Sequence, residues 1–272
     1  MTLRLLTLNV WHDQGPWDRR RGRIRQWLHR LDPDVVALQE VLQGPGRDQL
    51  AEIFDDHGFD LAFAPATRFW RDPAIGFGNA VASRYPIRDR AVLQLPASDD
   101  DLERRVALAT AIETPWGLLG LTCTHLNWKL HHGRVRERQA VALADFARDR
   151  RPSLDLPPVI AGDLNAEPDS AEIRYLTGLQ SLDGRSVLFY DAWRLAGDGG
   201  PGHTWSNRNP YARSAIEPDR RIDYVLAGYP QPSGIGRIEA CRVVCDDAED
   251  GVWPTDHFGV YAELRTEALE FV

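Results

Sequence analysis

The segment "PPVIAGDLNAEPDS" (157–170) places several polar side chains directly after an apolar run that is typical of a buried strand. On an extended segment, residues i and i+2 face the same way, so Asp163 and Asn165 can point at one reacting centre. A carboxylate beside an amide donor could hold and deprotonate a water while the amide stabilises developing negative charge. Glu167 and Asp169 follow, and we interpret them as turn and helix-cap residues.

Further polar residues stand at the ends of other strand-like segments. Asn9 and Glu40 offer an oxygen-only ligand set that suits Mg²⁺ or Mn²⁺ rather than zinc. Asp223 lies inside an otherwise apolar strand, where an unpaired charge is costly, and either His257 or a metal ion could neutralise it. Taken singly, an asparagine at a strand end is most often a turn residue, and a lone histidine is more often structural than catalytic.

Short strand-like runs recur along the chain, and several are apolar at consecutive positions, which indicates strands covered on both faces. They span residues 3–10, 34–41, 79–87, 105–115, 117–126, 157–165, 221–228, 238–246 and 258–265, with a tight hairpin turn predicted at 113–117. Helical periodicity appears at 18–31, 134–150 and 169–182, the last with Asp169 or Ser170 as N-cap. Because the helices fall between groups of strands, this order fits a two-sheet sandwich covered outside by helices.

Composition sets the broad class of the protein. The 272 residues are 43% hydrophobic, which is ample for a large core, and we expect one domain over residues 1–272. The formal net charge of −8 argues against broad non-specific binding to duplex DNA, which requires the neutralisation of many phosphates. Cys123, Cys241 and Cys245 form neither a disulfide framework nor a zinc pattern. With no membrane span and an N-terminus typical of a first strand rather than a signal peptide, we expect a cytoplasmic protein.

Taken in order, a series of segments resembles the endonuclease/exonuclease/phosphatase superfamily, whose members have the DNase I-like fold. The matching segments are "TLNVW", "DPDVVALQEV", "GNAVASRYPI", "ERRVALA", "THLNW", "GDLNAEP", "RRIDYVL" and "TDHFGV", which extend from near the start of the chain to about residue 260. Each motif is short, but their order and intervals together are distinctive. The resemblance implies an α+β fold, a four-layered α/β/β/α sandwich of two mostly antiparallel sheets with helices on the outer faces.

The same resemblance implies roles for the residues introduced above. Asn9 and Glu40 match ligands of a catalytic Mg²⁺ or Mn²⁺ ion, with Asp256 as a further candidate. Asp163 matches the residue that orients or deprotonates the attacking water, and Asn165 matches the donor to the scissile phosphate.

Other matching positions would surround the phosphate. His257 matches the imidazole that stabilises the phosphoryl transition state, with Asp223 orienting and charging it. The remaining matches are the phosphate-contacting pair His125 and Asn127, and the supporting residues Asn79 and Arg105, with Arg104 as the alternative to Arg105 if the register is one residue off.

Such a set implies a divalent-metal-dependent phosphohydrolase that cleaves a phosphomonoester or phosphodiester by in-line attack of an activated water. The alternatives are a Mg²⁺-dependent nuclease acting on DNA or RNA and a catalytically silent binding module of the same fold. "THLN" departs from the Tyr-x-Pro-Asn segment that abasic-site endonucleases characteristically carry, and it looks more like the phosphatase, deadenylase and sphingomyelinase branches. The expected partner is therefore a phosphate ester, either a small organophosphate or a nucleotide or nucleic acid, and the oligomeric state stays open.

Three further features have alternative interpretations. Tryptophans in predicted loops form either walls near the site or ordinary packing; they are Trp11, Trp70, Trp128, Trp205 and Trp253. The arginines of 19–25 either contact phosphates or lie on a solvated helix face, and a nuclease would be supported if they or the arginines of 134–138 lined the groove beside Asp163. The histidines of 125–133 invite a zinc proposal, but they lack cysteine partners and an i, i+4 pair.

Overall fold

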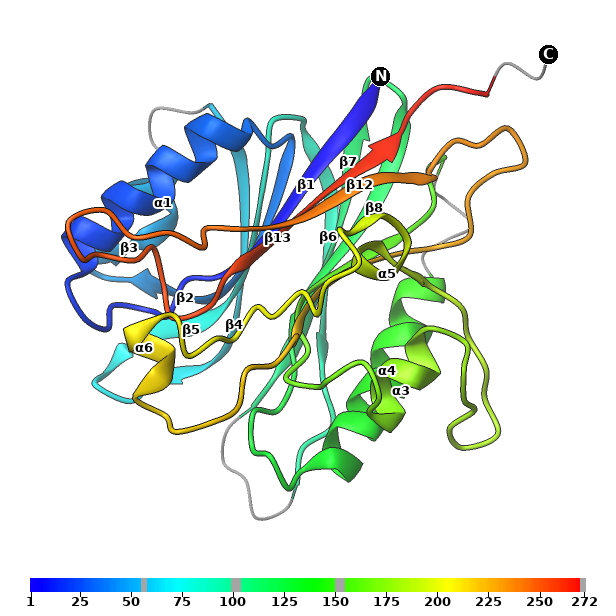
Figure 1. The fold of residues 1–272 in the computed structure, drawn as a ribbon. Helices are drawn as coiled ribbons and strands as arrows, with labels where there is room; N and C mark the ends of the chain where they lie inside the picture. Colours follow the sequence, from blue (N-terminus) through cyan, green and yellow to red (C-terminus); the bar gives the residue numbers. More distant parts are fainter. Residues whose placement is uncertain (55–57, 99–103, 150–154, 270–272) are drawn as a thin grey trace.

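Two β-sheets lie face to face in the computed structural model, which describes residues 1–54, 58–98, 104–149 and 155–269 (Figure 1). Within these residues the first sheet has seven strands, in the spatial order β12 (Ile238–Val244), β13 (Gly259–Arg265), β1 (Thr2–Asn9), β2 (Val35–Gly44), β5 (Asp72–Ser83) and β4 (Asp60–Phe69), with β3 (Arg47–Asp48) paired to β2. The second has six, in the order β10 (Tyr190–Asp191), β11 (Asp223–Ala227), β9 (Val159–Asp163), β8 (Gly117–His125), β7 (Val106–Thr114) and β6 (Ile87–Gln94). The pairs β1–β2 and β8–β9 are parallel and the other described pairs are antiparallel.

Helices cover the outer face of each sheet. α1 (Trp17–Leu31) and α2 (Gln49–Phe54) pack on the seven-stranded sheet, and α3 (Gly133–Asp149) and α4 (Ala171–Leu176) pack on the six-stranded sheet. Figure 1 shows α1 on one side of the two sheets and α3 and α4 on the other. The short helices α5 (Ala192–Ala196) and α6 (Pro210–Arg213) lie between β10 and β11 in the chain. The predicted four-layered sandwich is confirmed.

The alternation of side chains along the strands separates the apolar residues into layers. In β1, Leu3 and Leu5 belong to the core between the sheets, whereas Leu6 and Leu8 pack in the cluster that contains the buried residues of α1. Both faces of the strand are therefore apolar, which explains why its apolar residues stand at consecutive positions.

At one edge of the sandwich the inward positions of several strands become polar. Asn9 ends the inward row of β1, and Asp163 ends that of β9. Because β8 is parallel to β9, its last residue His125 lies opposite Asp163. Asp223, the first residue of the antiparallel β11, also lies opposite Asp163. Backbone register alone thus places three of the predicted site residues side by side.

The structure differs from the predicted elements in several places. The predicted strand 79–87 is two strands, because β5 ends at Ser83 and β6 begins at Ile87. The predicted helix 169–182 is only α4, which begins after the N-cap Ser170 and ends at Leu176, shortly before Gly178 at φ +77°. The hairpin turn at 113–117 is confirmed by the pairing of β7 with β8.

Other elements were not predicted. They include β4, β6, α2 and the first half of β5. β4 contains Pro65, and its register against β5 shifts between Pro65 and Thr67 and again between Arg68 and Phe69. Five of the eight β6 positions are exposed. Neither strand therefore carries a regular apolar pattern. The single domain over residues 1–272 stays a prediction.

Candidate active site

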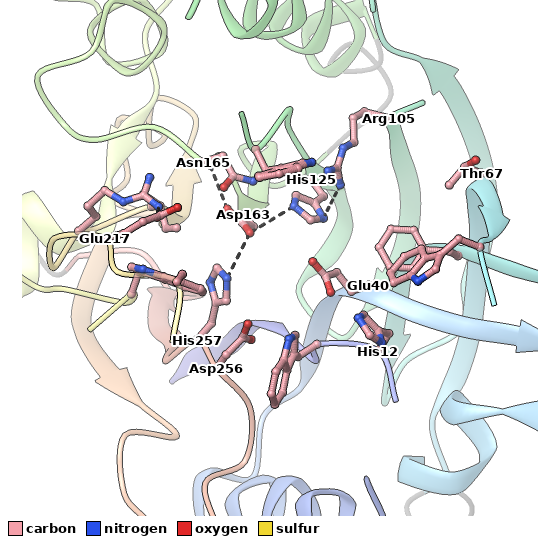
Figure 2. A pocket seen from close by; sticks show the side chains of 18 residues that line it. His12, Glu40, Thr67, Arg105, His125, Asp163, Asn165, Glu217, Asp256 and His257 are labelled. Atoms are coloured by element: carbon pink, nitrogen blue, oxygen red, sulfur yellow. Dashed lines mark hydrogen bonds and ion pairs between the residues drawn. The ribbon is translucent and has the colours of Figure 1, made fainter. Parts of the chain in front are cut away.

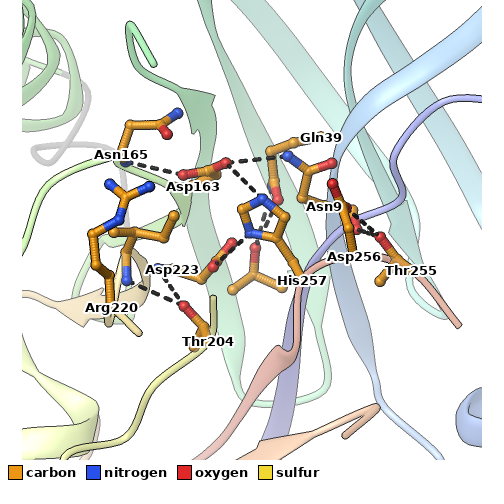
Figure 3. Close-up of polar contacts among 12 residues, drawn as sticks. Asn9, Gln39, Asp163, Asn165, Thr204, Arg220, Asp223, Thr255, Asp256 and His257 are labelled. Carbon is orange, nitrogen blue, oxygen red and sulfur yellow. Dashed lines mark hydrogen bonds and ion pairs between the residues drawn. The ribbon is translucent and has the colours of Figure 1, made fainter. Parts of the chain in front are cut away.

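Asp163 lies at the centre of a hydrogen-bonding network that joins the two sheets (Figure 3). Its Oδ2 accepts a hydrogen bond from Nδ2 of Asn9 at 3.1 Å and lies 3.3 Å from Nε2 of His125 and 3.7 Å from Nε2 of His257. Its Oδ1 accepts the backbone N–H of Asn165 at 2.9 Å. Burial is the main cause that raises the pKa of Asp163 to about 6. A carboxylate with such a pKa is suited to take a proton from a water near neutral pH.

His257 is held as a cation beside this carboxylate. Its Nδ1 lies 2.9 Å from Oδ2 of Asp223. Burial lowers the pKa of His257, but the charges of Asp223 and Asp163 outweigh burial and hold the pKa well above its usual range. Trp205 contacts the imidazole at 4.9 Å between ring centroids, and Oγ1 of Thr204 accepts the backbone N–H of Asp223. The ring is therefore fixed in both charge and orientation.

His125, in contrast to His257, is neutral. Nη1 of Arg105 lies 2.9 Å from Nδ1 of His125. Burial, followed by the charges of Arg105 and His257, lowers the pKa of His125 well below its usual range. Because the arginine donates to Nδ1 of a neutral ring, Nε2 carries the hydrogen that points toward Asp163. Arg104 is exposed, so Arg105 is the arginine that faces the site.

Asn165 lies just beyond the end of β9 rather than in an extended strand. Its φ of +49° turns the backbone so that its own N–H reaches Asp163. Its Nδ2 donates to the carbonyl of Leu126 at 3.2 Å, and the amide carries a second hydrogen. Asp163 and Asn165 both line the same pocket, although a left-handed turn and not the i, i+2 alternation brings them together.

Two more carboxylates belong to the first sheet and to the loop that leads into its strand β13. Glu40 sits in a β-bulge of β2, where the register against β5 shifts between residues 38 and 41, and its φ is +61°. Asp256 lies shortly before β13, in the loop that also carries His257. Nδ2 of Asn9 donates to Oε1 of Glu40 at 3.3 Å, which links this carboxylate to Asp163. Burial and the charge of Asp256 raise the pKa of Glu40 to about 7, and burial also raises that of Asp256.

These two side chains fit a divalent cation. Their raised pKa values mean that the surroundings supply too little positive charge for the half-buried Glu40 and the buried Asp256. Carboxylate oxygens are the ligands that Mg²⁺ and Mn²⁺ prefer. The amide oxygen of Asn9 accepts the N–H of Trp11 at 2.9 Å, so this residue presents its nitrogen to the carboxylates. Glu40 and Asp256 are thus the groups that would hold an ion, with Asn9 beside them.

A second set of ligand atoms belongs to Asp163, Asp223 and His257, which lie within 4.8 Å of one another. A histidine binds a metal through a free lone pair on a neutral ring. Because His257 is protonated and directs both nitrogens at carboxylates, we interpret this set as a hydrogen-bonded triad rather than a metal site.

The network opens into a pocket of about 520 Å³ (Figure 2). Four of the tryptophans discussed above line it, whereas Trp253 stacks on Phe258. The pocket also has lining residues that sequence analysis did not identify, including His12, Thr67, Phe77, Glu217 and Arg220. Arg220 begins the motif "RRIDYVL" but has no role assigned to it there, and the other four lie outside the quoted motifs, where no local signal marks them.

Two predicted substrate-binding residues lie outside this lining within the described part of the chain. Asn127 is buried, and its side-chain oxygen accepts the N–H of Lys129 at 3.1 Å. Nδ2 of Asn79 donates to the carbonyl of Val106 at 2.8 Å and so connects β5 of one sheet to β7 of the other. Both hydrogen bonds support the walls around the site.

The arginine runs have structural partners instead of facing the site. Arg20 is buried and donates to the carbonyl oxygens of Val10, Trp11, His12, Gln14 and Pro254 at 2.8–3.1 Å. Arg23 pairs with Asp247 and Glu249, and Arg136 pairs with Glu172. Among the described residues that line the pocket, the arginines are Arg105 and Arg220.

The other sequence features do not form additional sites. The ring centroids of His131 and His132 lie 4.5 Å apart, and no described group of metal-ligating residues contains either histidine. All three cysteines are free and buried. No helix in the described part of the chain is long and apolar enough to cross a membrane.

Comparison with known proteins agrees with this architecture. A model of the Endonuclease/Exonuclease/phosphatase family matches residues 6–257. Protein angel of Drosophila melanogaster is 23% identical over 203 residues, which are 64% of this chain and 50% of that protein. The chain therefore spans about half the length of this relative.

Solved structures share the fold over nearly the whole chain. An endonuclease/exonuclease/phosphatase from Beutenbergia cavernae is 26% identical with a TM-score of 0.73, over 97% of this chain and 71% of that one. The human Nocturnin catalytic domain is 18% identical with a TM-score of 0.73, over 97% of this chain and 93% of that one. Truncated TDP2 of Caenorhabditis elegans is 18% identical with a TM-score of 0.74, over 97% of this chain and 98% of that one. With a family match over residues 6–257 and the same two-sheet fold, this chain belongs to the endonuclease/exonuclease/phosphatase family.

Proposed function

We propose that the protein is a divalent-metal-dependent hydrolase of phosphoric esters, in which an activated water attacks phosphorus in line. Membership of the family supports phosphoric ester hydrolysis. The observation that carries the proposal is the position of Asp163. Its strand places it in register with His125 and Asp223, and Asn9 connects it to the carboxylate of Glu40.

The proposed ion is Mg²⁺ or Mn²⁺ held by Glu40 and Asp256. When bound, such an ion would neutralise charge on the phosphate and make the phosphorus easier to attack. The phosphate would then lie between these carboxylates and Asp163, inside the pocket that all three residues line.

The chain's own residues would handle the water and the developing charge. Asp163 would hold the water and accept its proton, since a carboxyl of pKa about 6 is mostly ionised at neutral pH. The His257 imidazolium, kept charged by Asp223, would donate to an oxygen of the pentacovalent transition state. Asn165 and the Nε2 hydrogen of His125 would supply further donors around that oxygen.

The first test is hydrolysis of p-nitrophenyl phosphate and bis-p-nitrophenyl phosphate with Mg²⁺, with Mn²⁺ and with EDTA. We expect metal-dependent turnover that Asp163→Asn reduces by roughly 100-fold or more, because it removes the base and leaves the shape unchanged. The ratio of the two rates separates a phosphatase from a phosphodiesterase. Equal turnover in EDTA, or wild-type turnover in the variant, would reject the mechanism.

A nuclease is the second candidate within the family. Its specific support would have been arginines of 19–25 or 134–138 beside Asp163, and in the described structure those arginines do not line the pocket. A silent binding module would bind Mg²⁺ or phosphate without turnover, and calorimetric titration of the inactive protein would identify it.

We also propose that the protein works in a reducing compartment, as expected for the cytoplasm. Cys123, Cys241 and Cys245 are free and buried, and burial raises the pKa of Cys123 and Cys241 to about 12, so these thiols are unreactive. Thiol counting by mass spectrometry, without added reductant, should find all of them unpaired. A disulfide between any two would contradict the proposal.

A further inference from the structure

The pocket extends well beyond the residues assigned to the reaction. Figure 2 shows Glu40 between the Asp163–His257 side of the pocket and a second side that carries His12 and Thr67. Trp70, Phe77 and Trp128 also line the pocket. The mechanism proposed above uses none of these aromatic side chains.

Trp70 is an exposed indole on a rigid base. It lies at the turn between β4 and β5, and 61% of its surface is exposed. Its ring centroid lies 5.0 Å from that of His12, 4.6 Å from Phe69 and 5.7 Å from Phe77, and all three supporting residues are buried. A supported aromatic ring can receive another ring without losing much conformational freedom on binding.

A second exposed indole belongs to the same pocket. Trp128 is 50% exposed and follows β8, whose last residue is His125. Isolated apolar side chains on a surface are ordinary, but these two exposed tryptophans line the cavity that holds the candidate catalytic groups, and aromatic lining is typical of ligand pockets.

The charges in the pocket limit how many phosphates a substrate can bring. Among the described lining residues, four are acidic, namely Glu40, Asp163, Glu217 and Asp256, and three are cationic, namely Arg105, Arg220 and His257. Arg220 is paired with Glu217, and His257 lies between Asp163 and Asp223. The proposed metal ion would neutralise Glu40 and Asp256, which lie at the reaction centre. His12 adds no charge, since burial lowers its pKa. Beyond the reaction centre an extended polyanion would find little further compensation, whereas a single phosphate attached to an uncharged ring would fit.

We propose that Trp70 and Trp128 form a subsite for a planar aromatic group of the ester whose phosphate lies at Asp163. This inference rests on the proposed hydrolysis and specifies its substrate class. The aromatic group is either a nucleobase or a simple arene, because both stack on indole in the same way.

Matched esters test the subsite without changing the reactivity of the leaving group. Benzyl phosphate is compared with cyclohexylmethyl phosphate, and adenosine 5′-monophosphate with ribose 5-phosphate, each as the monoester or methyl diester that the p-nitrophenyl assay favours. We expect kcat/KM to favour the aromatic member by about tenfold, mainly through KM, which is within the range for stacking on an aromatic side chain. A preference in the adenosine pair alone indicates a nucleobase, and one in the benzyl pair alone indicates an arene.

Variants assign the preference to the indole. Trp70→Ala should reduce the ratio of the two kcat/KM values to near one, and Trp70→Phe should restore most of it because a ring is retained. Tyr229→Ala is the matched control, since Tyr229 is 58% exposed and is not among the lining residues of the pocket. That variant should keep the wild-type ratio.

Binding to the Asp163→Asn variant separates this inference from the proposed reaction. Calorimetry should show tighter binding of adenosine 5′-monophosphate or benzyl phosphate than of the non-aromatic partner. Discrimination in binding without turnover in the wild type would leave the subsite in place and reject hydrolysis. Equal binding and equal kcat/KM within both pairs, unaffected by Trp70→Ala, would overturn the subsite while hydrolysis stands.

Discussion

The charge on a buried histidine depends on the carboxylates around it, and this site holds two histidines in opposite states. His257 lies between Asp223 and Asp163 and is cationic, whereas His125 lies against Arg105 and is neutral. His257 can therefore stabilise negative charge as a cation, while His125 donates a hydrogen bond as a neutral ring.

The first prediction concerns Asp223→Asn. Without the carboxylate, burial should lower the pKa of His257, so the imidazolium is lost at a lower pH than in the wild type. We expect kcat at pH 8 to fall by roughly 100-fold and the alkaline limb of the kcat–pH profile to move to lower pH. Ester hydrolysis followed between pH 6 and 9 measures both effects.

Two comparisons make this test specific. The double variant Asp223→Asn/His257→Ala should be no slower than His257→Ala, because the two residues act as one unit. Asp219→Asn, which changes a carboxylate bonded to Asn207 outside the pocket, should keep the wild-type profile. Additive losses in the double variant, or an alkaline limb that does not move, would show that Asp223 does not act through His257.

At the scale of elements, Arg20 makes the largest set of side-chain contacts to the connection from β1 to α1. Trp11 and His12 have φ values of +55° and +32°, which are strained conformations for residues other than glycine. The guanidinium of Arg20 binds the carbonyls of this turn and that of Pro254, and it lies 5.0 Å from the ring of Trp11. It thereby fixes the loop that carries Asp256 to the loop that carries the pocket wall.

The second prediction is that Arg20→Met destabilises the fold. The methionine approximates the volume of the stem but leaves several buried carbonyls without donors, so we expect the free energy of unfolding to fall by about 3 kcal/mol or more. Arg20→Lys should lower the free energy of unfolding by a similar amount, since an ammonium group cannot reach all the carbonyl oxygens that surround the planar guanidinium. Urea denaturation in EDTA measures the change.

Arg19 provides the control on the same helix. It is exposed, so Arg19→Met should change the free energy of unfolding by less than about 0.5 kcal/mol. If Arg20→Met proved as stable as Arg19→Met, the arginine would not hold the two loops together.

The same elements show what the sequence could and could not predict. The central strands carry consecutive apolar residues, so their positions can be predicted from the sequence alone. The same holds for the polar residues His125, Asp163 and Asp223 at their ends. The bulge that aims Glu40 into the pocket depends on pairing with β5, which no local pattern reveals. Arg20 is one of several arginines with the same local surroundings, and only tertiary packing distinguishes it from the exposed Arg19.

At the scale of the whole molecule, the candidate site lies where the two sheets meet. Asn9 and Glu40 come from the seven-stranded sheet, and His125, Asp163 and Asp223 come from the six-stranded sheet. Several of these groups are buried carboxylates, so the stability of the whole fold is linked to their protonation and to any cation that neutralises them.

The last prediction is that the metal-free protein loses stability as the pH rises from about 4.5 to 7. The pKa of Glu40 is raised from 4.5 to about 7 in the fold, and that of Asp163 from 3.8 to about 6. Between these values the folded state holds protons that the unfolded chain has released, so the free energy of unfolding falls with rising pH. His12 and His125 oppose the decline below pH 6.5, because their folded pKa values are lowered and the unfolded chain binds the protons there. The decline remains because three carboxyl groups, those of Glu40, Asp163 and Asp256, have raised pKa values. His257 adds to the decline only above pH 6.5, since its folded pKa is raised above that unfolded value. Thermal unfolding in EDTA at pH 5.0, 6.0 and 7.0 should therefore show a decreasing Tm.

Mg²⁺ should reverse this decline, because a cation held by Glu40 and Asp256 supplies the charge that the fold lacks. The increase in Tm on adding Mg²⁺ should be small at pH 5, where bound protons compete with the ion, and larger at pH 7. Glu40→Gln removes one titrating group without changing its shape, so it should flatten the decline in EDTA and reduce the Mg²⁺ increment at pH 7. An increment that is the same at both pH values and in the variant would mean that the ion binds elsewhere. The raised pKa of Glu40 would then reflect a loss of stability of the fold at neutral pH that no bound metal ion compensates.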